Sequence, residues 1–293
     1  GEQVDRELPS IRQFDHAIAV VERPAGRVYL DLTADLAPYG DLPESDQGRF
    51  GLIVYPDGTS EQVTLPETPA GDNLNQTIIV GALSSDGYVS ATYQERGSGS
   101  RQYNLRSLFV GPIDSLKRAD FARSIATKLF PGATADSLQI FDGRDLTAEP
   151  RVALQIVHGL AARSSGGTVI LSLPFPSMRA MADAATMLEA RQPRRFPIDA
   201  AKVIGPVTTE TELKLTLPPG WRVRLPPSVD VSGKWGNYQA HYQQNGDTLA
   251  VHRRLEGARG VYPPASLSDL AAWLRAVAQD DVSYLVIEPS VTP

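Results

Sequence analysis

Residues 14–33 read FDHAIAVVERPAGRVYLDLT, two apolar, β-branched runs on either side of a turn that contains Pro and Gly. This pattern is typical of an antiparallel β-hairpin. If residues 23–26 form the loop, Glu22 faces Arg27 and the numbers of paired residues sum to 49. Because side chains alternate between the two faces of a strand, this register decides which residues of the hairpin lie on the same face.

The register brings one histidine and one acidic residue onto a common face. His16 lies opposite Thr33, and Asp31 is two residues from that partner. Diagonal neighbours of this kind are roughly 7–8 Å apart at the backbone, close enough for an imidazole and a carboxylate to meet. A carboxylate beside an imidazole fixes the tautomer and leaves the other ring nitrogen free to take a proton from a nucleophile. The alternative is that both are ordinary polar residues at the hairpin rim.

The segment after the hairpin, residues 34–49, favours the catalytic interpretation. With the hairpin it resembles the part that closes the core of bacterial transglutaminase-like proteins, in which uncharacterised β-rich domains flank a papain-like Cys-His-Asp core. The resemblance is carried by FDH at residues 14–16, LDLT at 30–33, PYG at 38–40 and SDQGR at 45–49. This chain has Asp15 where the family usually has Asn, and Leu32 where it usually has Pro. The resemblance implies that His16 is the catalytic base and Asp31 its orienting carboxylate.

The chain contains no Cys, whereas the family nucleophile is a Cys that opens a helix upstream of the His. The resemblance therefore implies the C-terminal part of a longer protein, with the upstream half of the same protein as the partner that carries the Cys. We expect the chain alone to be inactive in acyl transfer, because a base without a nucleophile lacks the covalent step. A protein or peptide substrate and a periplasmic or cell-envelope location are implied by the resemblance only.

Composition excludes several classes of function. The net charge of −6 argues against nucleic acid as a partner, since phosphate neutralisation needs a basic face. No apolar run approaches the roughly 20 residues that span a bilayer, so no membrane segment is expected in this chain. Without Cys there is no disulfide or thiolate metal site. His158, His241 and His252 lie in three separate predicted strands, and we expect neither a metal site nor a cofactor.

The length of 293 residues suits one and a half or two domains. Two prolines within residues 65–73 mark a linker, because proline cannot donate to a strand ladder. We therefore predict a C-terminal piece of a transglutaminase-like core at residues 1–70. A β-rich accessory region follows at residues 71–293, with residues 71–200 and 201–293 as two candidate subdomains.

Short strands and a few helices predict an α+β fold with antiparallel sheets. The strands are expected at residues 50–55, 77–83, 88–95, 137–141, 151–160, 168–173, 211–217, 221–225, 229–231, 236–243, 248–255 and 284–288, and the helices within residues 101–130, at 177–190 and from Ser266 onwards. Ser266 and Asp269 have the spacing of a capping box. Trp221, Trp235 and Tyr238 could form a sugar platform, but hairpin aromatics are more often core residues.

Two non-catalytic hypotheses remain beside the acyl-transfer enzyme. In one, the chain is a degenerate relative that keeps the transglutaminase-like fold as a binding or scaffolding module of the cell envelope. In the other, it is a β-rich interaction domain with a chance hairpin motif, and its binding surface lies within residues 72–293. Neither requires the His and Asp of the hairpin to act together.

Overall fold

The computed structural model describes residues 4, 10–111, 114–165, 167–190 and 193–289, and their fold is α+β, as predicted. The strands are β1 (Ala19–Val21), β2 (Val28–Leu30), β3 (Phe50–Val54), β4 (Ser60–Thr64), β5 (Leu74–Leu83), β6 (Tyr88–Gly97), β7 (Thr134–Gln139), β8 (Arg151–Leu160), β9 (Ala162–Ser165), β10 (Thr168–Ser172), β11 (Ile198–Asp199), β12 (Thr208–Thr216), β13 (Arg222–Arg224), β14 (Val229–Gly233), β15 (Gly236–Asn245), β16 (Thr248–Gly257), β17 (Val261–Tyr262) and β18 (Tyr284–Glu288). The α-helices are α1 (Gln102–Ser107), α2 (Ser115–Leu129), α3 (Ala180–Glu189) and α4 (Leu267–Val277). Short 3-10 turns lie at Ile11–Gln13, Gly99–Arg101, Ala200–Lys202 and Pro264–Ser266.

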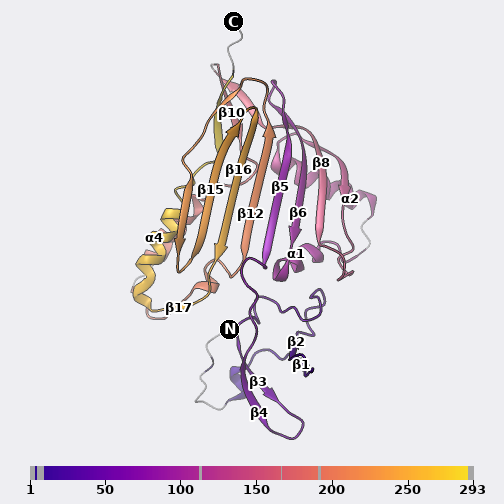
Figure 1. Ribbon diagram of the computed structural model, residues 1–293, viewed down its shortest axis with the longest axis vertical. Coiled ribbons are helices and arrows are strands. Elements are labelled where there is room, and N and C mark those ends of the chain that lie inside the picture. The colour runs from indigo at the N-terminus through magenta and orange to yellow at the C-terminus, as the bar shows by residue number, and fades with distance from the viewer. Residues whose placement is uncertain (1–3, 5–9, 112–113, 166, 191–192, 290–293) are drawn as a thin grey trace.

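The N-terminal part of the chain consists of two small hairpins below one end of a large sheet (Figure 1). β1 pairs with β2 in the predicted register, with Ala19 opposite Leu30 and Val21 opposite Val28. The amide of Gly26 donates to the carbonyl of Arg23 over 2.9 Å and closes the predicted turn. β3 and β4 form the second hairpin, and the chain then continues into the large sheet.

The large sheet has eight strands in the order β14-β15-β16-β12-β5-β6-β8-β7. Its neighbours are antiparallel except at the centre, where β12 runs parallel to β5. Because of this central pairing, strands from residues 71–200 and from residues 201–293 share one sheet. A second sheet of four strands has the order β13-β18-β10-β9.

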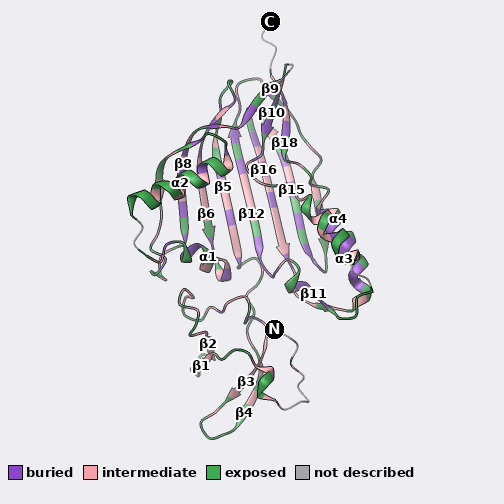
Figure 2. Ribbon diagram, turned by 180° about the vertical axis from the view of Figure 1, so that it is seen from behind, coloured by how far each residue is buried: buried purple, intermediate pink, exposed green. Residues whose placement is uncertain are grey.

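One face of the eight-stranded sheet is covered and the other is open. Helices α2, α3 and α4 and the four-stranded sheet lie over the covered face, which Figure 2 views from their side. Burial alternates along the strands accordingly: in β15, Tyr238, Ala240 and Tyr242 are buried, whereas the residues between them are partly or fully exposed. The open face carries mostly polar side chains, so its period-2 pattern was visible in the sequence.

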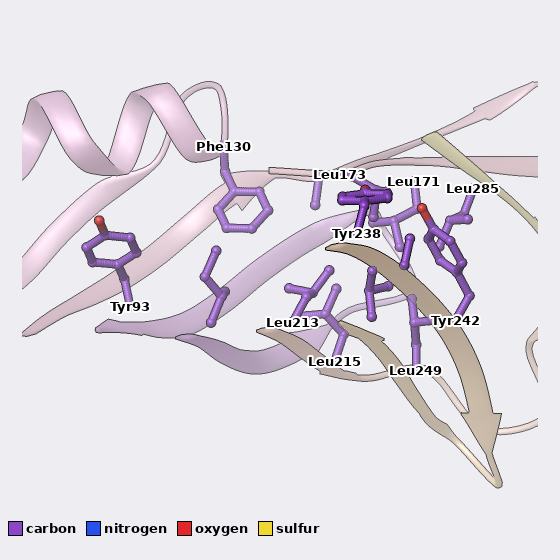
Figure 3. Packing of buried hydrophobic residues seen from close by; sticks show 14 of the residues in the cluster. Tyr93, Phe130, Leu171, Leu173, Leu213, Leu215, Tyr238, Tyr242, Leu249 and Leu285 are labelled. Carbon is purple, nitrogen blue, oxygen red and sulfur yellow. The ribbon is translucent and has the colours of Figure 1, made fainter. Parts of the chain in front are cut away.

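The core lies between the two sheets and the helices (Figure 3). Leu213 and Leu215 of β12 and Leu249 of β16 are fully buried there beside Leu171 of β10. A continuous cluster of this kind supplies most of the favourable free energy of folding, at about 25 cal/mol for each Å² of apolar surface removed from water. The core therefore holds the two sheets together as one unit.

A buried ionic network fastens the chain after α4 to this core. Arg253 Nε lies 2.7 Å from Asp280 Oδ2, with 4% and 0% of the two side chains exposed. The hydroxyls of Tyr238 and Tyr242 both donate to the Asp280 carboxylate. Arg253 also donates to the carbonyls of Pro176 and Val282. Such a pair is tolerated in a core because its charges are matched and because Nη1 and Nη2 of Arg253 donate to further acceptors.

Helix α4 begins at the residue predicted from its periodicity, but the predicted capping box is wrong. Ser266 is the N-cap residue, yet its hydroxyl caps no backbone amide. Instead, Lys234 Nζ donates to Ser266 Oγ over 3.3 Å and pairs with Asp269 at 2.8 Å. Of the three aromatic residues considered for a sugar platform, Trp221 is 7% exposed and Trp235 only 3%, so they belong to the core, as expected.

Candidate active site

His16 and Asp31 lie side by side beyond the end of the β1–β2 hairpin. The distance from His16 Nε2 to Asp31 Oδ1 is 3.1 Å. The two side chains differ in environment: that of His16 is 37% exposed and that of Asp31 only 6%. Among the described residues, none bonds to His16 Nδ1. The pair therefore has the form of an oriented imidazole whose second nitrogen has no partner within the described part of the chain.

Asp31 is held in place by Thr33, the residue predicted to face His16. Its Oδ1 accepts hydrogen bonds from the amide of Thr33 at 2.9 Å and from the hydroxyl of the same residue at 2.8 Å. Burial acts to raise the pKa of the Asp31 carboxyl, but the hydrogen bonds from Thr33 and His16 outweigh it and keep the pKa below its usual value. Asp31 is therefore held as a carboxylate, the form that orients an imidazole.

A third side chain, Asp46, reaches this pair from the segment between β2 and β3. Its Oδ2 lies 3.9 Å from His16 Nε2, and its side chain is 9% exposed. Oδ1 accepts from the Ser45 hydroxyl at 3.1 Å, whereas Oδ2 is buried and accepts no hydrogen bond from any described residue. Burial, and after it the charge of Asp31, raise the pKa of Asp46. Sequence reasoning did not select Asp46, because it is far from the hairpin register.

The segment that carries Asp46 is anchored by the next residue, Gln47. Its side-chain nitrogen donates to the carbonyl of Leu42 at 2.8 Å. Its Oε1 accepts from Arg259 Nη2 at 2.7 Å and from the amide of Thr68 at 3.2 Å. Gly48 then turns the chain with a φ of +69°, where a Cβ atom would meet the Glu67 side chain. The Gln-Gly pair thus holds the preceding aspartate against the hairpin.

A second contact joins the site to α1. Gln102 donates to Asp41 Oδ2 at 3.1 Å and accepts from Arg106 Nε at 2.9 Å. The Tyr103 hydroxyl is buried and has no hydrogen-bond partner among the described residues. Burial and then the charges of Asp41 and two further acids, Asp46 and Asp31, raise the pKa of this tyrosine. The carboxyl groups of Asp31, Asp41 and Asp46 thus all act on this buried tyrosine.

The hairpin itself is braced from the side of β3 and β4. Arg27 donates to Glu22 at 2.8 Å and to Glu61 Oε2 at 2.6 Å, and Tyr55 also donates to Glu61. These bonds lower the pKa of Glu61 to about 2, with Arg27 as the main cause and Tyr55 as the second. The brace fixes the turn end of the hairpin, opposite the end that carries His16.

The other histidines do not join this site. His241 lies 3.0 Å from Asp230 and His252 lies 2.7 Å from Glu210, both on the open face of the large sheet. Neither pair has a second carboxylate gathered around it among the described residues. These two pairs are cross-strand contacts, and they provide matched controls for His16.

Two hollows of the molecule lie elsewhere. One of 750 Å³ has an apolar lining from α3, α4 and β12, and one of 360 Å³ lies beside Arg259 and Gly236. Neither is lined by His16 or Asp31. The candidate site is therefore an exposed histidine on a hairpin edge, open to another segment or molecule.

No described helix is both long and apolar enough to cross a membrane.

One family model matches part of the chain. The family described as a domain of unknown function with a solved structure (DUF3858) matches residues 171–287, which run from β10 into β18. These residues do not include the His16 site. No match was found among curated proteins.

Two solved structures align with the chain at low similarity. A protein of Parabacteroides distasonis ATCC 8503 described as a proposed protease is 13% identical, with a TM-score of 0.38, and the alignment covers 93% of this chain and 35% of that one. The folded domain of Mycobacterium tuberculosis LppM is 12% identical, with a TM-score of 0.23, and the alignment covers 68% of this chain and 95% of that one. The chain thus spans about a third of the length of the first structure.

Proposed function

We propose that His16 is the general base, and Asp31 its orienting carboxylate, in a papain-like Cys-His-Asp centre for acyl transfer. The observation that carries this proposal is the 3.1 Å distance between His16 Nε2 and Asp31 Oδ1. With Nε2–H donating to the carboxylate, Nδ1 keeps its lone pair and can take the proton of a thiol. The exposed side of the ring is where such a thiol would approach.

The nucleophile is assigned to an upstream part of the same protein, because this sequence has no Cys. The thiolate would attack the carbonyl carbon of a peptide or protein amide, and His16 would pass its proton to the leaving amine. The acyl-enzyme would then react with water in a protease or with a second amine in a transglutaminase. We place the parent protein in the periplasm or cell envelope on the strength of the family resemblance.

The test uses the protein extended upstream through its own coding sequence. Two rates are measured: alkylation of the upstream Cys by iodoacetamide and hydrolysis of a fluorogenic peptide, with and without an added primary amine. General-base catalysis contributes about 10²–10⁴-fold, so His16→Ala should lower peptide hydrolysis by at least about 100-fold. Alkylation should slow by roughly tenfold near neutral pH, because an unassisted thiol of pKa about 8.5 is still a few per cent thiolate. An amine that diverts the acyl group would identify a transglutaminase.

The matched control is His241→Ala, which removes a histidine of β15 that also lies about as close to an aspartate, at 3.0 Å. It should leave both rates unchanged. An upstream sequence without a Cys, or His16→Ala rates equal to those of the control, would exclude catalysis. The chain would then be a binding or scaffolding module on the same fold.

A further inference from the structure

The side chains of His16, Asp31 and Asp46 offer three ligand atoms to one point in space. One nitrogen or oxygen from each lies within 4.8 Å of the others. His16 Nε2 is 3.1 Å from Asp31 Oδ1 and 3.9 Å from Asp46 Oδ2. Imidazole nitrogen and carboxylate oxygen are ligands that zinc accepts, and three protein ligands with one open position are the usual form of a reactive zinc site.

The distances suit a small divalent ion. Tetrahedral ligands at about 2.0–2.2 Å from zinc are separated from one another by roughly 3.3–3.5 Å. The two separations from His16 Nε2 lie on either side of this range. The ligand oxygens of Asp31 and Asp46 lie within 4.8 Å of each other, so a bound ion would draw the three side chains together.

An independent observation comes from Asp46. Its side chain is more than nine-tenths buried, and its Oδ2 points toward His16 without a hydrogen-bond donor among the described residues. A buried carboxylate oxygen without a partner costs free energy. Among the described residues, no Lys or Arg forms an ion pair with Asp46 or Asp31, so their charges are not balanced by a cationic side chain other than His16.

We propose that His16, Asp31 and Asp46 bind one zinc ion. Two carboxylates and a neutral imidazole carry a charge of about −2, which the ion neutralises, and Asp46 Oδ2 gains the partner that it lacks. Binding requires the tautomer of His16 that carries its proton on Nδ1, so the proton moves from Nε2 to Nδ1. The lone pair of Nε2 then goes to the ion, which replaces the hydrogen bond to Asp31. Zinc binding is a property separate from the proposed catalysis, because it requires no nucleophile.

The ion also has a consequence for acyl transfer. A ring coordinated through Nε2 carries its proton on Nδ1 and no longer donates a hydrogen bond to Asp31. It therefore cannot take a proton from a thiol, and His16 no longer acts as a base. Zinc therefore inhibits the extended protein, and a chelator restores its activity. The binding itself is tested on this chain alone, so failure of the catalytic proposal and failure of the metal proposal give different results.

The test is calorimetric titration of ZnCl₂ into the tag-free, chelator-treated chain and its variants. The wild-type chain should bind one equivalent of zinc saturably. Loss of a second-shell partner costs about 10–100-fold in metal affinity, so loss of a direct ligand in His16→Ala or Asp46→Asn should weaken binding by at least about tenfold. The control His241→Ala removes a pair with an exposed carboxylate and should bind as the wild type does.

Absence of one-to-one binding by the wild type, or an Asp46→Asn variant that binds as tightly, would overturn the proposal. Circular dichroism melting of each variant verifies that it is folded. A second measurement needs no variant: nitrogen NMR of the histidine rings during the titration. Zinc should shift the His16 ring nitrogens before those of His241, and a first shift at His241 would also overturn the proposal.

Discussion

Arg259 Nη2 donates to Gln47 Oε1 over 2.7 Å, although 212 residues separate the two in the chain. This bond and the 3.4 Å bond from Arg259 Nη1 to the carbonyl of Gln47 join the site segment to the loop after β16. Gln47 is 3% exposed, so its carbonyl groups have little access to water. The position of Asp46 thus depends on a residue of the loop after β16.

Replacing Arg259 should lower stability by removing the hydrogen bonds that anchor Gln47, next to Asp46. Arg259→Ala leaves a buried acceptor with one donor fewer and should lower the free energy of unfolding by about 1–3 kcal/mol. Urea denaturation measures the loss. Arg224→Ala is the control, because its side chain is 72% exposed in a pair with Glu288 and should change stability by less than about 1 kcal/mol. Equal losses in the two variants would contradict the anchoring role.

The buried network around Asp280 should be the most sensitive point of the core. Asp280→Ala leaves Arg253 as an unpaired buried charge, which costs about 3–5 kcal/mol. Guanidinium denaturation of this variant should show a large fall in the midpoint. Asp230→Ala removes an acid that is 56% exposed beside His241 and should have little effect. If the free energy of unfolding of Asp280→Ala falls as little as that of Asp230→Ala, Asp280 does not neutralise the buried charge of Arg253.

In the metal-free chain, Asp46→Asn should be stabilising. Burial and the charge of Asp31 disfavour the ionised form of Asp46, and an amide removes that charge and supplies a donor toward Asp31. We expect a gain on the order of 1 kcal/mol in chelator-treated protein, measured by thermal unfolding. The exposed Asp35→Asn serves as the control. If Asp46→Asn is destabilising without metal, the carboxylate has a donor that the contacts do not reveal.

Acid should release the brace between Arg27 and Glu61. The pKa of Glu61 is lowered from 4.5 to about 2, chiefly by its hydrogen bonds with Arg27. A lowered pKa in the folded state means that the contribution to stability is fully present above pH 4.5 and is lost as the pH falls through 2. Carboxyl NMR of Glu61 should show this low midpoint. A midpoint near 4.5 would mean that the brace is not formed in solution.

The strands and the partners of those joined by a short turn were largely predictable from the sequence, but pairings between segments far apart in the chain were not. Alternation and the turn at residues 23–26 placed the β1–β2 register correctly, because both depend on local spacing. The parallel pairing of β5 with β12 has no local signal, since it joins segments such as Thr77 and Thr211 that are far apart in the chain. Helix α4 was visible from its apolar stripe, whereas Lys234 displaced the predicted cap through a tertiary contact.

Two residues of the candidate site were predictable from the sequence, and the third was not. His16 and Asp31 belong to one hairpin, so period-2 spacing was enough to bring them together. Asp46 comes from a loop whose course is set by Gln47 and Arg259, and only the tertiary structure shows that it is buried beside the pair. The catalytic roles and the domain boundary at residue 70 stay predictions.

The central claim is that Asp31 holds His16 as a base with a free Nδ1. The most direct measurement is the tautomer of His16, read from ring-nitrogen NMR of the chelator-treated chain at mildly alkaline pH. We expect a proton on Nε2, donated in a hydrogen bond to Asp31, and a larger population of the other tautomer in Asp31→Asn. A wild-type ring that carries its proton on Nδ1, with no change in Asp31→Asn, would contradict it.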